Sequence, residues 1–256
     1  MNQPRHQDGR VAVVTGATQG IGKAIAERLA AEGARVGVNG REQTDAITAV
    51  ADSIGGFPVV ADVSSHDEVG AAFAAVEQQH GAIDVLVCNA AYMTMLPFVD
   101  HEADDWWRNI DTNLSGTFHC IQAALPGMKR RGGGNIVIIA SEWGVVGWPN
   151  ATAYASSKAG LISLTKALGR ELAPAGISVN AVAPGITDTP QLNVDAQDAG
   201  LTLEQMHAEY AEQIPAHRIG RPEEIAAAVA LLSRPGQRAL VGQTIQANGG
   251  STRCRA

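Results

Sequence analysis

Short apolar runs alternate along the chain with longer stretches whose apolar residues recur at helical spacing. The apolar runs predict strands at residues 10–15, 34–38, 58–61, 83–87, 135–140, 177–182 and 241–247. The stretches between them predict helices that begin after the glycines at 16–22 and at residues 44–53, 67–80, 153–172 and 223–231, with one or two helices at 103–129. This alternation predicts βαβ units, and therefore an α/β fold whose parallel sheet has helices on both faces.

The longest irregular stretch runs from Gly185 to about Gly200, with turn residues at Pro190 and Gly200. Long loops in compact domains are often lids or binding loops. A helix is expected to follow at residues 203–213. We therefore predict a substrate flap at about residues 185–215.

Composition and charge restrict the class of protein. The 256 residues fit one domain, 1–256, and 45% hydrophobic residues are enough for a large core. The net charge of −7 argues against nucleic acid or an anionic membrane as a partner. The first ten residues are polar, and no apolar run is long enough to cross a membrane. We expect a cytoplasmic protein, and neither the cysteines nor the histidines have metal-site spacing.

A glycine-rich segment, TGATQGIG at residues 15–22, follows the first predicted strand and opens the first helix. Glycines at such a junction permit a tight turn and a close approach of a pyrophosphate to the backbone. The spacing is G-x-x-x-G-x-G rather than the commoner G-x-G-x-x-G. We interpret the segment as a dinucleotide-binding loop with the residues Gly16, Thr18, Gln19, Gly20, Ile21 and Gly22.

Three further residues have the pattern of a proton-transfer group. Tyr154 and Lys158 lie four apart on a predicted helix, so both side chains lie on one face. A nearby ammonium favours the phenolate, and we expect it to lower the pKa of Tyr154. Ser141 ends a predicted strand and offers a hydroxyl to the same substrate oxygen. This group predicts hydride chemistry at a carbonyl carbon.

Together these motifs resemble the short-chain dehydrogenase/reductase family, over residues 9–250. The resemblance rests on residues 15–22, the Asn89-Ala90-Ala91 turn, Asn113, Ser141, Tyr154, Lys158 and Pro184-Gly185. It implies a Rossmann-like, doubly wound, seven-stranded parallel sheet, a nicotinamide cofactor and a homotetramer. It also implies that Tyr154 exchanges the proton, that Lys158 holds the nicotinamide ribose, and that Asn113 holds a water linking Lys158 to solvent.

The residues after the second predicted strand bear on the choice of cofactor. By resemblance to the family, Gly40 occupies the position at which NAD-preferring members carry Asp, and Arg41 follows it. An Arg guanidinium suits a 2′-phosphate. NADP(H) is therefore favoured, with NAD(H) as the alternative and a solvated Arg41 as the simpler interpretation. By resemblance, Asp62 and Val63 contact the adenine, although Asp62 could equally be a cap, and Asn89 supports the sheet beside the cofactor.

The remaining predicted contacts lie around the reacting carbon. By resemblance, the segment with Pro184, Gly185, Thr187 and Thr189 contacts the nicotinamide carboxamide, although the two threonine hydroxyls could equally stabilise the turn itself. The resemblance also places Met93, Trp143 and Trp148 at the substrate mouth. Such a clustering of tryptophans predicts an apolar or ring-bearing substrate, with oligomer or lid packing as the alternative. Glu142, next to Ser141, could contact a polar group of the substrate or stay solvated, and we expect it to be solvated.

The sequence thus predicts an NADP(H)-dependent alcohol dehydrogenase or carbonyl reductase acting on a small molecule. A 3-oxoacyl thioester reductase is an alternative, although no basic cluster marks a dock for a carrier protein. A non-catalytic NAD(P)-binding sensor or scaffold is the other alternative. The spacing between Tyr154 and Lys158 argues against an enoyl reductase, because enoyl reductases of the family typically place more residues between the two.

Overall fold

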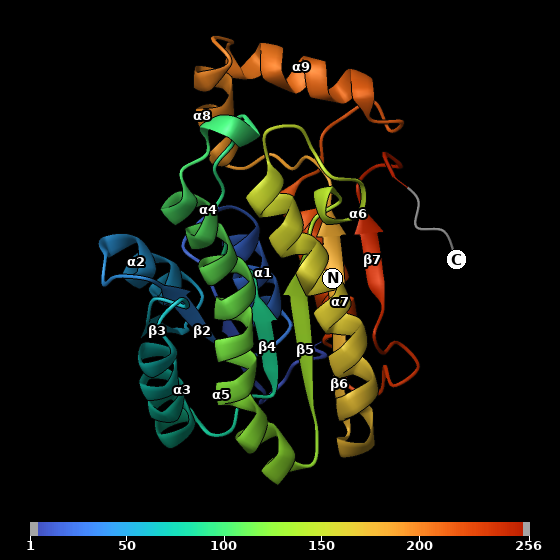
Figure 1. The fold of residues 1–256 in the computed structure, drawn as a ribbon. Helices are drawn as coiled ribbons and strands as arrows, with labels where there is room; N and C mark the ends of the chain where they lie inside the picture. Colours follow the sequence, from blue (N-terminus) through green and yellow to red (C-terminus); the bar gives the residue numbers. More distant parts are fainter. Residues whose placement is uncertain (1–4, 253–256) are drawn as a thin grey trace.

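The computed structural model of the protein describes residues 5–252 and contains one parallel sheet of seven strands in the order β3-β2-β1-β4-β5-β6-β7 (Figure 1). The strands are β1 (Val11–Val14), β2 (Arg35–Gly40), β3 (Phe57–Val60), β4 (Val85–Cys88), β5 (Gly134–Ile139), β6 (Ile177–Pro184) and β7 (Thr244–Ala247). The order reverses between β1 and β4, which makes the sheet doubly wound. The predicted fold is confirmed.

Helices cover both faces of this sheet. The longer helices are α1 (Gly20–Ala31), α2 (Asp45–Ser53), α3 (His66–His80), α4 (Ala103–Ile110), α5 (Gly116–Arg131), α7 (Thr152–Leu172), α8 (Gln191–Asp198), α9 (Leu203–Gln213) and α10 (Pro222–Leu232). The short ones are the 3-10 turns η1 (Phe98–Asp100) and η3 (Ala173–Ala175), the π-helix η2 (Asp111–Ser115) and α6 (Trp143–Val146).

Two buried clusters hold the layers together, one on each face. Val11 and Val13 of β1 join the cluster under α3, α5 and α7, whereas Ala12 and Val14 join the cluster under α1, α2 and α10. Successive side chains of a strand point to opposite faces, so a strand buried on both sides is apolar throughout. That is why the strands of the central sheet are continuous apolar runs in the sequence.

The carboxyl ends of the strands point toward α8 and α9, at the top of Figure 1. Ligands of open α/β sheets bind at this edge, near the point where the strand order reverses. The predicted helix at 203–213 is α9, and its first turn is held by a capping box between Thr202 and Gln205. The prediction that residues 185–200 are irregular is wrong for the second half of this range, because α8 begins directly after Pro190.

The single or double helix expected at 103–129 is α4 and α5 joined without a break by the π-helix η2. A π-helical turn inserts an extra residue into a helix and is often found at functional sites. Asn113 lies in this turn. The π-helical turn therefore contains Asn113, a residue that the sequence predicted to belong to the active site.

Candidate active site

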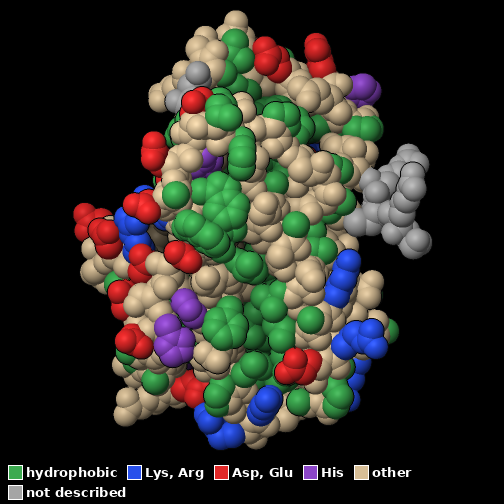
Figure 2. Space-filling view, in the orientation of Figure 1, with side chains coloured by type: hydrophobic (Ala, Val, Ile, Leu, Met, Phe, Trp, Pro, Cys, Tyr) green, Lys and Arg blue, Asp and Glu red, His purple; other side chains and the backbone are tan. Residues whose placement is uncertain are grey.

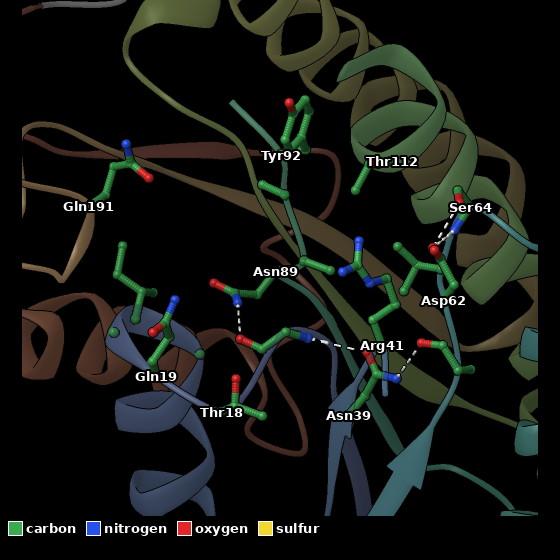
Figure 3. Close-up of a pocket in the computed structure, with 18 of the residues that line it drawn as sticks. Thr18, Gln19, Asn39, Arg41, Asp62, Ser64, Asn89, Tyr92, Thr112 and Gln191 are labelled. Carbon is green, nitrogen blue, oxygen red and sulfur yellow. Dashed lines mark hydrogen bonds between the residues drawn. The ribbon is translucent and has the colours of Figure 1, made fainter. Parts of the chain in front are cut away.

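A cleft of about 720 Å³ opens at the carboxyl ends of β1, β2, β3 and β4 (Figure 3). The predicted cofactor residues that line it are Gly16, Thr18, Gln19, Gly20, Ile21, Gly22, Arg41, Asp62, Val63, Asn89 and Thr189. A second cavity of about 240 Å³ has in its wall Met93, Ser141, Trp143, Tyr154, Pro184, Gly185, Thr187 and Thr189. Ile21, Ala91, Thr189 and Gln191 line both spaces, so the two adjoin.

The glycine loop has the backbone that its sequence predicts. Gly16 and Gly20 have positive φ angles of 59° and 53°, in the left-handed region that favours glycine. A methyl group on Gly22 would overlap the carbonyl oxygen of Gly16 and come within 2.5 Å of the Asn89 amide nitrogen. Gln19, the N-cap of α1, makes no side-chain cap. The first N–H groups of α1 therefore remain available to an anion in the cleft.

Two asparagines hold this loop against the sheet. The Asn39 side chain accepts a hydrogen bond from the N–H of Gly16 (3.2 Å) and donates to the carbonyl oxygens of Val59 (2.9 Å) and Ala61 (3.1 Å). The Asn89 amide donates to the carbonyl oxygen of Gly16 at 3.0 Å. Asn39 was not among the predicted site residues. Its signal in the sequence is a polar residue within the apolar run of β2.

The residues after β2 and β3 form one end of the cleft. Arg41 is exposed, and its nearest ionic partner is Glu42, at 3.2 Å between Nη2 and Oε1. The Asp62 carboxylate accepts from the N–H and the hydroxyl of Ser64, at 2.9 and 2.7 Å. Ser65 rather than Asp62 caps α3. Free helix N–H groups, a guanidinium and a glycine cradle in one cleft fit a dinucleotide.

Tyr154 and Ser141 meet in the smaller cavity. Burial raises the pKa of Tyr154 to about 12, and a hydrogen bond with the Ser141 hydroxyl partly offsets that rise. Burial lowers the pKa of Lys158 to about 8. The expected lowering of the Tyr154 pKa by Lys158 is not what this structure gives. Lys158 Nζ instead donates to the carbonyl oxygen of Ile139 at 2.8 Å and lies 5.4 Å from the centre of the phenol ring.

Asn113 is fully buried and uses its side chain as a bridge. Its Oδ1 accepts from the N–H of Tyr92 at 2.7 Å, and its Nδ2 donates to the Tyr92 carbonyl oxygen and to the hydroxyl of Ser157, both at 3.0 Å. Ser157 lies beside Lys158 on α7. Asn113 therefore ties the segment after β4 to the helix that carries Tyr154.

The predicted substrate residues do not all line the same space. Met93 and Trp143 line the cavity that contains Tyr154. The ring of Trp143 meets Tyr154 edge-on, with 5.9 Å between ring centroids, and stacks on Trp148 at 5.0 Å. Trp148 lies behind Trp143, in a neighbouring cavity of about 260 Å³.

Glu142 was expected to be solvated, and this is wrong. The residue is only 6% exposed, because the chain turns from β5 into α6 at this point and carries the side chain inward. Burial raises the pKa of its carboxyl group, and a hydrogen bond with Asn248 partly offsets that rise.

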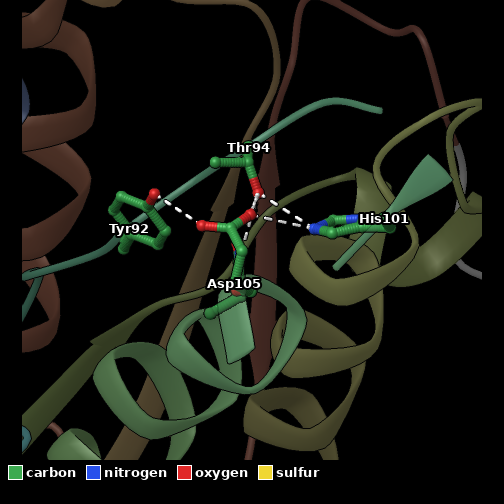
Figure 4. A network of polar contacts seen from close by, with 5 residues as sticks. Tyr92, Thr94, His101 and Asp105 are labelled. Atoms are coloured by element: carbon green, nitrogen blue, oxygen red, sulfur yellow. Dashed lines mark hydrogen bonds and ion pairs between the residues drawn. The ribbon is translucent and has the colours of Figure 1, made fainter. Parts of the chain in front are cut away.

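A polar network that the sequence did not reveal supports the wall of the cleft (Figure 4). The hydroxyls of Tyr92 and Thr94 donate to the two oxygens of Asp105, at 2.8 and 2.6 Å, and His101 Nε2 lies 3.0 Å from the second oxygen. The Arg108 guanidinium lies 4.1 Å from the centre of the Tyr92 ring. These contacts fix the segment after β4 on α4.

The segment after β6 is connected to α9 at its outer end. Asp188 Oδ1 lies 3.5 Å from Nε2 of His207 on α9. Thr187 donates to the carbonyl oxygen of Gly185 at 3.0 Å, so its hydroxyl holds the local turn. No group of three or more His, Cys, Asp or Glu side chains that could hold a metal occurs among residues 5–252.

Comparison with known proteins identifies the family of this chain. A family model described as enoyl-(acyl carrier protein) reductase matches residues 16–252. The 3-oxoacyl-(acyl-carrier-protein) reductase FabG of Staphylococcus aureus is 41% identical over 244 residues, which cover 93% of this chain and 96% of that protein. The chain belongs to the short-chain dehydrogenase/reductase family. It is an oxidoreductase of that family, and membership implies a nicotinamide cofactor.

Two solved structures show the same architecture. The aldohexose dehydrogenase of Thermoplasma acidophilum has a TM-score of 0.89 at 31% identity and covers 97% of this chain, which covers 96% of it. A protein described as a putative gluconate dehydrogenase from Agrobacterium tumefaciens has a TM-score of 0.90 at 33% identity, with 97% and 98% covered. The single-domain Rossmann-like fold is therefore that of the family.

Proposed function

We propose that the protein interconverts a ketone or aldehyde and an alcohol with NADP(H), and that Tyr154 is the proton donor and acceptor. The observation that carries this proposal is the meeting of Ser141 and Tyr154 in a cavity that adjoins the glycine-loop cleft. NADPH supplies the hydride when it is bound. In reduction, Tyr154 donates its proton to the substrate oxygen while the Ser141 hydroxyl holds that oxygen in place.

The protonation state of Tyr154 is consistent with proton donation in the reduction direction. With a pKa raised to about 12, the Tyr154 phenol is protonated at neutral pH and ready to donate. Lys158 has its ammonium on the Ile139 carbonyl oxygen, beside the phenol ring, where it can reach the ribose of a bound cofactor. Asn113 acts as a positioning residue through Ser157 and Tyr92.

The cofactor end of the proposal is supported by Arg41 and Gly40. Arg41 is a cation in the wall of the cleft that forms an exposed ion pair with Glu42, and such pairs are weak. Gly40 has no carboxylate to repel a 2′-phosphate or to hold the ribose hydroxyls of NAD. NADP(H) is therefore the proposed cofactor, with Asp62 and Val63 at the adenine and Thr187 and Thr189 near the nicotinamide.

Reduction of a 3-oxoacyl thioester is the second candidate, and the names of the FabG relatives favour it. No basic cluster marks a carrier-protein dock in the sequence. The two candidates share the catalytic group, so only the substrate distinguishes them.

The test follows the loss of NADPH or NADH with small ketones, with an oxoacyl thioester and with no substrate. We expect the protein to reduce small ketones, with a higher kcat/KM with NADPH than with NADH. Turnover of the thioester alone would replace the first candidate by the second. Cofactor binding without any turnover would instead favour a sensor or scaffold.

We also propose a cytoplasmic homotetramer. Figure 2 shows hydrophobic side chains gathered on the face that carries α4, α5 and α7, and Trp107 on α4 and Phe118 on α5 are exposed. No helix among the described residues is long and apolar enough to cross a membrane. Light scattering coupled to size-exclusion chromatography measures the number of subunits.

A further inference from the structure

Asp195 on α8 is an acidic residue in the wall of the cavity that contains Tyr154. From α8, this cavity is lined by Gln191, Leu192 and Asp195, whereas residues 193–194 between them are exposed and do not line it. Positions three and four apart on a helix lie on one face, so these three residues form a single stripe. The spacing indicates that α8 turns the side chain of Asp195, and not only its backbone, toward the cavity.

The surroundings of Asp195 leave its carboxylate within reach of a ligand. The residue is half-buried rather than enclosed. The Gln191 amide donates to Asp195 Oδ1 at 3.0 Å, and Gln191 lines both the cofactor cleft and the cavity that contains Tyr154. Because an amide is neutral, this hydrogen bond orients the carboxylate without cancelling its charge.

The two adjoining spaces differ in the charges of their walls. The cofactor cleft has arginines, Arg41 and Arg108, as well as acids in its wall. Among residues 5–252, no Lys, Arg or His lines the cavity that contains Tyr154, although Asp195 and the buried Glu142 do. Lys158 is held on a backbone carbonyl oxygen and is not part of that wall. An anionic cofactor therefore meets cations in its cleft, whereas the smaller cavity has acids alone.

The charge of Asp195 also acts on its other neighbours. Burial raises the pKa of Tyr210 on α9, and the Asp195 carboxylate raises it further. Tyr210 lines the cavity behind Trp143, next to the one that contains Tyr154. A charge in the wall of a cleft acts over several ångströms, because the protein around it screens the charge less than water does. Contact with the ligand is therefore not required for Asp195 to influence binding.

We propose that Asp195 is a specificity-determining residue that selects the substrate by charge. A ketone or alcohol that carries a positive charge or none enters the cavity, and one that carries a carboxylate is repelled by Asp195. The substrate class is thus a neutral or cationic carbonyl compound rather than an oxo acid. The inference rests on the proposed function and narrows its substrate.

The experiment uses three ketones of nearly equal shape and different charge: para-acetylbenzoate, para-acetylbenzamide and para-acetylbenzamidine, which are anionic, neutral and cationic. Each is reduced with NADPH, and its kcat/KM is divided by that of the neutral amide. Asp195→Asn keeps the shape of the residue and removes its charge. Relative to the wild type, we expect this variant to raise the carboxylate-to-amide ratio by about tenfold and to lower the amidine-to-amide ratio by about tenfold. Differences in intrinsic reactivity cancel, because each ratio is compared between two proteins.

Glu204→Gln is the matched control. Glu204 is an exposed acid in the first turn of α9 and lines neither the cavity that contains Tyr154 nor the one behind Trp143. The variant removes the same charge from a neighbouring helix and should keep the wild-type ratios.

Each outcome has a defined meaning. Equal ratios in the wild type and Asp195→Asn would overturn the inference and leave the proposed function intact. The same change in Glu204→Gln would also overturn it, because the effect would then come from the net charge of the protein. If another ketone is reduced but these three are not, their inhibition constants against that ketone are compared, and the same preference for charge is expected. If the wild type reduces no ketone at all, the proposed function fails and the inference fails with it.

Discussion

The ammonium of Lys158 donates to the carbonyl oxygen of Ile139 at 2.8 Å, and this bond fixes the lysine on the last residue of β5. Lys158 is 2% exposed, so one carbonyl oxygen replaces most of its hydration. The strand end that delivers Ser141 therefore also holds the lysine. The ammonium lies 5.4 Å from the centre of the Tyr154 ring, and burial of the phenol raises the pKa of Tyr154 to about 12.

The buried lysine predicts a pH-dependent stability. Its pKa falls from 10.5 in the unfolded reference to about 8 in the folded protein. Between these values the unfolded chain binds more protons, so stability should rise with pH over this window, by up to about 3 kcal/mol from this group. We expect Lys158→Met to remove that rise. Urea unfolding at pH 7 and at pH 10 measures the difference.

Lys166→Met is the matched control, because Lys166 is exposed on the same helix. It should leave the pH dependence of the wild type unchanged. If wild type and Lys158→Met respond equally to pH, the buried ammonium is not the titrating group.

The proposed role of Tyr154 predicts the outcome of removing one oxygen atom. Tyr154→Phe keeps the ring against Trp143 and should leave NADPH binding as it is. Turnover should fall by about a hundredfold or more, since the proton donor is lost. Single-turnover kinetics together with NADPH fluorescence titration measure the two quantities separately. Undiminished turnover in this variant would remove Tyr154 from the mechanism.

The sequence predicted elements whose pattern is local. The glycine loop, the strands and α9 each carry their own periodicity or capping residues, and their bounds agree with the prediction to within a few residues. The helix α8 was missed because Pro190 was taken as a turn residue, although a proline just before or at the start of a helix is favourable. The π-helix around Asn113 has no local signature, since an extra residue in a helix leaves the composition unchanged.

The site was predicted less completely than the fold, for a related reason. Residues such as Tyr154 and Ser141 belong to recognisable motifs, but burial depends on what other segments pack against a side chain. Glu142 looks like an exposed acid after a strand, whereas Gly185 and Asn248, which are distant in the sequence, lie against its side chain. Asn39 likewise gains its role from the loop it holds, because Gly16 lies on a different strand end.

The choice of cofactor can be tested at Arg41. Arg41→Ala should raise the KM for NADPH by about tenfold or more, because a guanidinium can hold a phosphate through two hydrogen bonds. The KM for NADH should stay unchanged. Arg35→Ala is the matched control, since Arg35 is an exposed arginine at the opposite end of β2. Equal effects on both cofactors would mean that Arg41 does not meet the 2′-phosphate.

The glycine loop gives the sharpest steric test. Gly22→Ala places a methyl group against the carbonyl oxygen of Gly16 and within 2.5 Å of the Asn89 amide, and both atoms belong to the bonded frame of the loop. Gly70→Ala is the matched control, because Gly70 lies inside α3 with open space where the methyl would go. Alanine replaces glycine in a helix with a gain of about 0.5–1 kcal/mol, so Gly70→Ala should be slightly more stable than the wild type. Gly22→Ala should instead bind NADPH more weakly by about tenfold or more, as the loop shifts away from the N-terminus of α1. Thermal melts with and without NADPH measure both effects, and a Gly22→Ala variant with the wild-type melting shift would show that the loop can open without loss of its cofactor site.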